Sequence, residues 1–158
     1  MTKFYYIAGP MSGIPRFNIP AFDEAAKNLR AAGYNIVSPA ELDDPVTREM
    51  AYNSLDGSTL KGVHPNGESW GDFLARDVKI VADKVTGIIA LPGWRESRGA
   101  RLEMMVALLC GHDLLEYDEK AKWPRHLPKH IAAEAILEEF LGTRRMAIAA
   151  GPDHFTLS

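Results

Sequence analysis

The sequence predicts an α/β protein with a parallel sheet and helices on both of its faces. Short β-rich runs alternate with segments whose apolar residues recur at helical spacing. The first forty residues follow the order strand, helix, strand, which is one βαβ unit. A later apolar run, Gly87–Leu91, is followed by a Gly/Ser turn and another helical pattern. In such sheets ligands bind at the carboxyl ends of the strands, where the strand order switches direction.

The first unit has clear boundaries. Phe4–Ala8 is rich in β-forming residues and ends at Gly9-Pro10, which is typical of a strand followed by a turn. Pro20 fits the first turn of a helix, and Gly33 fits its end. The apolar face of this predicted helix consists of Phe22, Ala25, Ala26 and Leu29. Tyr34–Ser38 is the second predicted strand.

The rest of the chain continues the alternation. We expect residues 43–70 to be an irregular loop, because they are polar and contain several glycine and proline turn signals. The elements predicted after this loop are a helix over Trp70–Lys84, a strand over Thr86–Leu91, a helix over Ala100–Cys110, a strand over Asp113–Tyr117 and a helix over Pro128–Leu141. We expect residues 1–142 to form one domain, followed by a weakly patterned arm or tail over residues 143–158.

Composition restricts the class of protein. The net charge of −3 gives no sign of a nucleic-acid partner, and no apolar run has the length of about 20 residues that spans a membrane. The single cysteine, Cys110, excludes an internal disulfide, and we expect a buried free thiol. The five histidines show no paired metal-ligand spacing. We therefore expect a cytoplasmic enzyme or binding domain without a metal or a cofactor.

The predicted helix over Ala100–Cys110 carries an acid, Glu103, in its first turns. Its small neighbours Ala100 and Ala107 leave room for a ligand beside the carboxylate. A solvated surface glutamate is the common alternative. A Gly/Ser turn between a strand and a helix can bind an anion, and this location favours a functional role for Glu103. We expect Glu103 to lie beside a core stripe formed by Leu102, Met105, Val106 and Leu109.

A second acid, Asp77, lies on an apolar helix face. Positions 73, 77 and 81 are spaced by four, so Asp77 shares a face with Phe73 and Val81. A buried acid costs free energy unless it is paired or hydrogen-bonded. An ion pair with Arg76 or Lys79 is disfavoured, because both residues point elsewhere on the helix. A hydrogen bond to a neighbouring loop and a second carboxylate in a ligand site both remain open.

The turns after the first and third predicted strands contain the other candidate residues. Gly99 allows the backbone to approach a ligand closely, and Ser97 fits both a helix N-cap and a phosphate contact. Trp94 is a candidate base-stacking platform or lid. We expect Tyr6, near the end of the first strand, to be a core residue whose hydroxyl could reach this site. The candidate contacts in the first loop are Gly9, Pro10, Met11, Ser12, Gly13 and Arg16.

These motifs resemble the nucleoside 2-deoxyribosyltransferase superfamily. The resemblance is carried by Tyr6-Ile-Ala-Gly9-Pro-Met, by Arg76-Asp77, and by Leu91-Pro-Gly-Trp94 with the Ser97-x-Gly99-x-x-x-Glu103 spacing. It covers residues 4–118 and is nearest to a branch of small phage and bacterial proteins that open with a YIAGPM-type motif. It implies a flavodoxin-like (Rossmann-like) fold and assembly into homodimers or larger homo-oligomers.

The resemblance also implies catalytic roles. Glu103 matches the nucleophile that attacks the anomeric carbon of a nucleoside or nucleotide. Asp77 matches the acid that helps to protonate the leaving base, and Tyr6 matches a tyrosine that orients the nucleophile. Ser97 matches a phosphate-binding serine of the nucleoside 5′-monophosphate N-glycosidases, six residues before the glutamate. The first loop departs from that pattern, because Pro10-Met11-Ser12 replaces a basic residue close after the glycine.

The expected function is therefore hydrolysis of a nucleoside 5′-monophosphate to free base and (deoxy)ribose 5-phosphate. The expected mechanism is a retaining one, through a covalent glutamyl-sugar intermediate. Base exchange between deoxynucleosides is one alternative, and a nucleotide-binding module without catalysis is another. A nicotinamide-dependent enzyme is disfavoured, because the GxGxxG fingerprint is missing. The expected partner is a small nucleotide, not a nucleic-acid polymer or a membrane.

Overall fold

Five strands form a single sheet, and the first four run parallel. The computed structural model describes residues 2–58 and 67–138. The strands are β1 (Phe4–Ala8), β2 (Asn35–Val37), β3 (Gly87–Ala90), β4 (Asp113–Asp118) and β5 (Trp123–His126). Their order in the sheet is β2-β1-β3-β4-β5, and β5 pairs antiparallel with β4. This is the 2-1-3-4-5 order of flavodoxin-like sheets, and it confirms the predicted α/β class.

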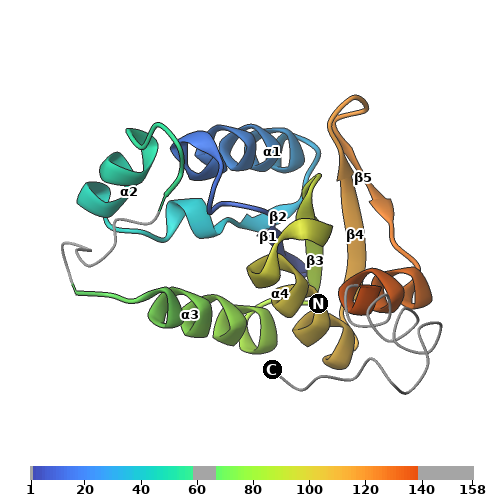
Figure 1. Cartoon of the computed structure of the whole chain (residues 1–158). Coiled ribbons are helices and arrows are strands. Elements are labelled where there is room, and N and C mark those ends of the chain that lie inside the picture. The colour runs from blue at the N-terminus through green and yellow to red at the C-terminus, as the bar shows by residue number, and fades with distance from the viewer. Residues whose placement is uncertain (1, 59–66, 139–158) are drawn as a thin grey trace, which may run out of the picture.

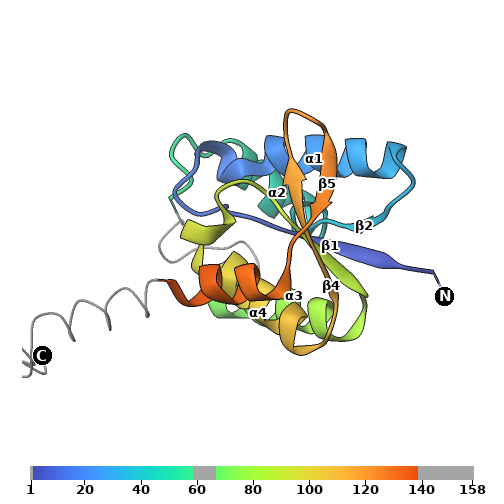
Figure 2. The same ribbon diagram turned by 90° about the vertical axis from the view of Figure 1, so that its right-hand side faces the viewer.

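Helices cover both faces of the sheet, as predicted. Helix α1 (Ile19–Ala31) lies on one face, and α3 (Trp70–Asp83) and α4 (Arg98–Leu109) lie on the other (Figures 1 and 2). A further helix over residues 129–138 lies on the same side as α3 and α4. Short 3-10 helices, η1 (Pro15–Asn18), η2 (Pro39–Glu41) and η3 (Trp94–Glu96), lie in the loops that follow β1, β2 and β3.

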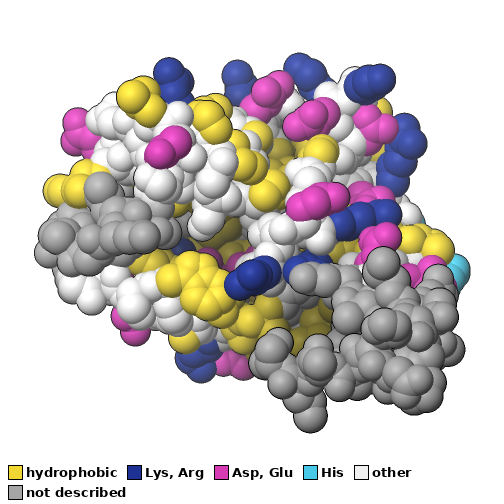
Figure 3. Space-filling view, viewed as in Figure 1, with side chains coloured by type: hydrophobic (Ala, Val, Ile, Leu, Met, Phe, Trp, Pro, Cys, Tyr) yellow, Lys and Arg dark blue, Asp and Glu magenta, His cyan; other side chains and the backbone are white. Residues whose placement is uncertain are grey.

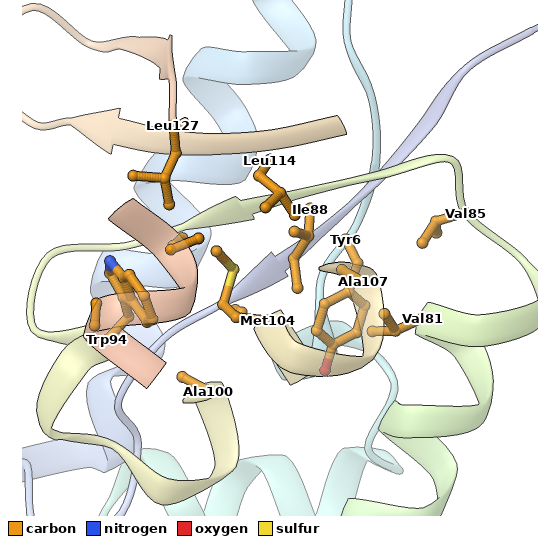
Figure 4. Packing of buried hydrophobic residues seen from close by; sticks show 14 residues of the cluster. Tyr6, Val81, Val85, Ile88, Trp94, Ala100, Met104, Ala107, Leu114 and Leu127 are labelled. Carbon is orange, nitrogen blue, oxygen red and sulfur yellow. The ribbon is translucent and has the colours of Figure 1, made fainter. Parts of the chain in front are cut away.

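The interior strand β1 contributes to both hydrophobic cores. Tyr5 and Ile7 pack into the cluster with α1, whereas Tyr6 and Ala8 pack into the cluster with α3 and α4. This division follows from the alternation of side chains along a strand. Tyr6 is fully buried there, and Figure 4 shows its ring among the side chains of β3, α3 and α4. A polar hydroxyl is therefore carried into the layer between the sheet and the helices.

The expected irregular loop over residues 43–70 contains a helix, and this prediction was wrong in part. Helix α2 (Pro45–Tyr52) begins after Asp44, whose carboxylate accepts hydrogen bonds from the backbone of Val46 and Thr47. An acidic N-cap followed by proline at the first helical position is a helix-start signal. Only Thr47 is buried in α2, so its short apolar pattern is weak.

The antiparallel edge strand β5 was not predicted. It pairs with β4 in a hairpin whose turn includes Lys122 at a positive φ of 52°. Pro124 is buried while Trp123, Arg125 and His126 are exposed, so the strand presents little apolar patterning. Proline is tolerated in β5 because an edge strand leaves one side of its backbone unpaired.

Helix α4 buries a different face from the predicted one. Its buried residues are Ala100, Glu103, Met104 and Ala107. Leu109, which was expected in the core, is 78% exposed, and Cys110 is exposed rather than buried. Two alanines flank Met104 on the buried face and allow α4 to approach the sheet closely, whereas Leu102 and Leu109 are more exposed. Glu103 is on the buried face itself, not beside it.

Some predictions reach beyond the described residues. The predicted C-terminal helix is seen over residues 129–138, and its last three predicted positions and the predicted tail over residues 143–158 lie outside the described chain. Within the described ranges, no helix is both long and apolar enough to cross a membrane.

Candidate functional site

The strand order switches between β1 and β3, and their loops meet at the carboxyl edge of the sheet. The strand that follows β1 in the chain, β2, lies on one side of the β1/β3 pair. The strand that follows β3, β4, lies on the other side. The backbone N–H of Leu91 donates to Ala8 at 2.8 Å, and a Cβ on Gly93 would lie 3.3 Å from Pro10. Figure 3 shows the surface hollowed between the layer of α1 and α2 and the layer of α3. The predicted location of the site thus coincides with the switch point.

Tyr6 and Glu103 form a buried hydrogen-bonded pair at this edge. The Tyr6 hydroxyl donates to Oε1 of Glu103 at 3.0 Å. Tyr6 is fully buried and Glu103 is only 7% exposed. The ring of Tyr6 is held between Val81 of α3 and Ala107 of α4, so its hydroxyl has little freedom (Figure 4). The sequence-predicted proximity of Tyr6 and Glu103 is therefore present in the structure.

Asp77 is buried and paired with its neighbour on α3. It is 8% exposed, and its Oδ1 accepts a hydrogen bond from Nε of Arg76 at 2.8 Å. Nη1 of Arg76 donates to Oδ1 of Asp43 at 2.7 Å. The guanidinium also lies 5.4 Å from the ring centre of Phe73. The prediction that Arg76 points away from Asp77 was wrong, because the long arginine side chain reaches back across the helix surface.

Burial and like charge together perturb the acids of the site. Burial and the neighbouring charge of Asp77 raise the pKa of Glu103 to about 8, although the Tyr6 hydroxyl and Arg76 oppose this rise. Burial also raises the pKa of Asp77, and the hydrogen bond from Arg76 opposes it. Burial and the carboxylates of Glu103 and Asp77 raise the pKa of Tyr6 well above its usual range. Perturbed acids at a switch point are typical of functional sites.

Ser97 and Gly99 lie at the start of α4. Ser97 is its N-cap, and the Ser97 hydroxyl accepts a hydrogen bond from the backbone N–H of Ala100 at 3.3 Å. Both Ser97 and Gly99 are half-buried, and a Cβ on Gly99 would meet no atom within 4 Å. The N-cap interpretation of Ser97 is confirmed, and its hydroxyl hydrogen remains available to an anion at the helix start.

The first loop is packed tightly against its surroundings at both ends. A Cβ on Gly9 would lie 3.0 Å from that of Leu91 and 3.2 Å from the ring of Phe22, so any other residue would push these side chains aside. The backbone N–H of Gly13, at a φ of +80°, donates to Gly57 at 2.9 Å. Met11 packs at the edge of the α1 core, and Ser12 is exposed. The loop therefore has a fixed path past the switch point.

Arg16 is held at the α2 end of the first loop. Its guanidinium donates to the hydroxyl of Tyr52 at 3.2 Å and lies 5.0 Å from the centre of that ring. Arg16 has a positive φ of 58°, and the two residues after it, Phe17 and Asn18, have positive φ angles of 49° and 58°. The side chain of Asn18 closes the loop by donating to the carbonyl of Pro10 at 2.9 Å.

Trp94 lies in the core instead of forming an open platform or lid. It is 2% exposed and packs in the cluster beneath β3 and α4 (Figure 4). Its indole N–H donates to Oε1 of Glu116 at 2.9 Å, and Arg95 contacts the same oxygen at 3.1 Å. Burial of the ring satisfies both its apolar area and its single donor. The expectation that Trp94 forms a base-stacking platform or a lid was therefore wrong.

Sequence reasoning missed the role of Asp43 and of Arg76. Asp43 lies at the end of the segment that joins β2 to α2, 33 positions before Arg76 along the chain. The sequence did offer one indication, the turn Leu42-Asp-Asp-Pro45. Asp44 serves as the helix N-cap, and the second acid, Asp43, remains for another partner. Among the described residues, no group of three metal-binding side chains is present.

The fold and this site define an α/β protein of flavodoxin-like topology with two buried carboxyl groups at its switch point. Residues 3–116 match the family described as Domain of unknown function (DUF4406), and the chain belongs to this family. The matched range contains Tyr6, Asp77 and Glu103. No protein with a curated description matches the chain.

Proposed function

We propose that this protein is a nucleoside 5′-monophosphate N-glycosidase. The observation that carries the proposal is the buried pair of acids, Glu103 and Asp77, joined to the Tyr6 hydroxyl at the switch point of the sheet. Cleavage of an N-glycosidic bond passes through a cation-like sugar, which a nearby carboxylate stabilises. The resemblance to the nucleoside 2-deoxyribosyltransferase superfamily supports the same chemistry.

In the proposed reaction the two acids have separate roles. An oxygen of Glu103 forms a bond to C1′ while the bond from C1′ to the base breaks. Asp77 delivers the proton that the leaving base requires. Water then attacks C1′ and releases Glu103 from the sugar, which gives (deoxy)ribose 5-phosphate. Tyr6 donates its hydrogen bond to Glu103 and fixes the orientation of the carboxyl group.

The start of α4 supports a phosphorylated substrate. The helix N-terminus presents backbone N–H groups and a partial positive charge, and the Ser97 hydroxyl lies beside them. The first loop adds the exposed hydroxyl of Ser12, whereas the backbone N–H of Gly13 already donates to Gly57. A 5′-phosphate held at this end would bring C1′ of the sugar toward Glu103, six residues further along the helix. We also propose that the enzyme acts in the cytoplasm as a homodimer or larger homo-oligomer.

The test is incubation of the intact protein with a panel of nucleoside and deoxynucleoside monophosphates, followed by chromatography of the free base. We expect base release from at least one monophosphate and a much slower reaction with the matching nucleoside. Glu103→Gln should reduce turnover by at least about a thousandfold, since it removes the nucleophile. Glu49→Gln, at an exposed position on α2, is the matched control and should keep full activity.

Three outcomes would contradict the proposal. Full activity of Glu103→Gln would remove Glu103 from the mechanism. Formation of a new nucleoside when a free acceptor base is added, without hydrolysis in its absence, would indicate base exchange. Tight nucleotide binding without any base release would indicate a binding module.

A further inference from the structure

Arg76 bridges two carboxylates that come from different parts of the chain. Its Nε contacts Asp77 at 2.8 Å, and its Nη1 contacts Asp43 at 2.7 Å. All three side chains are largely buried, with exposed fractions of 29%, 12% and 13% for Arg76, Asp77 and Asp43. Charge-assisted hydrogen bonds of this length are strong, and a guanidinium held at two points has a fixed position.

Glu103 has a different environment. Its hydrogen-bond partner in the described part of the chain is the Tyr6 hydroxyl, a neutral group, and no ion pair of Glu103 is present there. Glu103 is nevertheless as deeply buried as Asp77. Two neighbouring buried acids, of which only one contacts a cation, cannot both hold a negative charge at low cost, so one of them retains a proton.

We infer that Arg76 is a positioning residue: anchored by Asp43, it keeps Asp77 as a carboxylate and leaves the proton that the two acids share on Glu103. The geometry is selective because the guanidinium contacts Asp77 directly and reaches Glu103 only through space. Tyr6 lies between the two acids. Its hydroxyl donates to Glu103. Burial raises the pKa of Asp77 as well, but the direct hydrogen bond from Arg76 opposes that rise.

The charged and titratable groups around the pair agree with this assignment. They come from β1 (Tyr6), α3 (Arg76 and Asp77), α4 (Glu103) and the segment before α2 (Asp43). Although burial lowers it, hydrogen bonds to Asp77 and Asp43 raise the pKa of Arg76, so the guanidinium remains charged. Burial and the charge of Asp77 raise the pKa of Glu103 to about 8, above neutral pH.

The consequence for catalysis rests on the proposed function. The resting nucleophile is protonated, and its proton must leave before Glu103 can attack C1′. At rest the Tyr6 hydroxyl donates to Glu103, so its hydrogen must first turn toward Asp77. Tyr6 can then accept the proton of Glu103 and pass its own to Asp77, which protonates the leaving base. In the second step, water gives its proton to Asp77 and its oxygen to C1′. Transfer back through Tyr6 restores the proton of Glu103 and the carboxylate of Asp77.

The test is a pH titration of side-chain carboxyl ¹³C signals in the free protein, without any substrate. Asp77→Asn and Glu103→Gln identify the two signals by their loss. In the wild type, we expect the Glu103 signal to move through its full protonation shift near pH 8, while the Asp77 signal stays constant over the same range. In Arg76→Met, we expect both signals to move together, because the two acids then share the proton.

Two further variants serve as controls. Arg76→Lys restores a positive charge and should return the Asp77 signal toward wild-type behaviour, which loss of packing alone would not explain. Asp43→Asn keeps an acceptor for Nη1 and should leave Asp77 constant. The inference is overturned if Asp77 titrates near pH 8 in the wild type, or if it stays constant in Arg76→Met. Since the titration uses no substrate, absence of base release would contradict the proposed function and leave this result standing.

Discussion

The buried Glu103 should make the stability of this protein fall as the pH rises. The folded state raises the pKa of Glu103 to about 8 from its ordinary value of 4.5, because of burial and the nearby charge of Asp77. Between these two values the folded protein holds a proton that the unfolded chain releases. The contribution of Glu103 to stability is therefore complete below about pH 4.5 and is lost as the pH rises through about 8.

The magnitude follows from the same two values. The interval from 4.5 to about 8 corresponds, at about 1.4 kcal/mol per pKa unit, to about 5 kcal/mol of unfolding free energy. Domains of this size have total stabilities of about 5–15 kcal/mol, so a change of this order is easily measured. Glu103→Gln removes the titration while retaining an acceptor for the Tyr6 hydroxyl. It should therefore abolish most of the pH dependence.

The assay is urea unfolding followed by tryptophan fluorescence, since the chain has three tryptophans. The unfolding free energy would be measured at intervals from about pH 5 to about pH 9 for the wild type, Glu103→Gln and the exposed control Glu49→Gln. We expect the wild type and the control to lose stability in parallel and Glu103→Gln to change little. Parallel curves for all three proteins would refute the reasoning, because Glu103 would then not hold a proton in the folded state.

Four further outcomes are expected. For the wild type with its preferred nucleotide, kcat/KM for base release should fall as the pH rises through about 8, because Glu103 then loses the proton that reaches the leaving base. Tyr6→Phe removes the hydrogen bond that favours charged Glu103, so it should raise the midpoint of the Glu103 carboxyl titration; an unchanged midpoint would contradict this. Ser97→Ala should cost about 1 kcal/mol of unfolding free energy as a lost N-cap, and it should raise KM for monophosphates but not for nucleosides. Gly57→Ala would place a Cβ 2.0 Å from the Ile14 carbonyl oxygen at a positive φ, so thermal unfolding should show a loss of more than about 1 kcal/mol.

Local patterning was sufficient to predict the burial of Asp77 and the helix start before Glu103. The four-residue spacing of Phe73, Asp77 and Val81 indicated a buried aspartate, and Asp77 is 8% exposed. The strand-turn-helix pattern around Ser97 indicated a helix N-cap before Glu103, and both features are present. These predictions succeed because side-chain direction along a helix or strand repeats with a fixed period, whatever lies opposite it.

The spacing of apolar residues did not predict the core face of α4 or the burial of Trp94. The core face of α4 was misplaced because two alanines, and not the larger Leu102 and Leu109, approach the sheet. Trp94 was expected to be open because it lies in a turn, but Glu116 on β4 provides an acceptor that draws the indole inward. In both cases the deciding partner belongs to an element distant in sequence.

Residue spacing along the chain was enough to predict the α/β class, the location of the switch point and the burial of Asp77. The partners of Asp77 and Glu103, on which their charges depend, became visible in three dimensions. Arg76 pairs with Asp77 because Asp43, brought in from the segment before α2, anchors the guanidinium at its other end. Burial against the sheet leaves Glu103 with Tyr6 as its neutral partner. A proton's location depends on distances and solvent exclusion in three dimensions, which spacing along the chain does not specify.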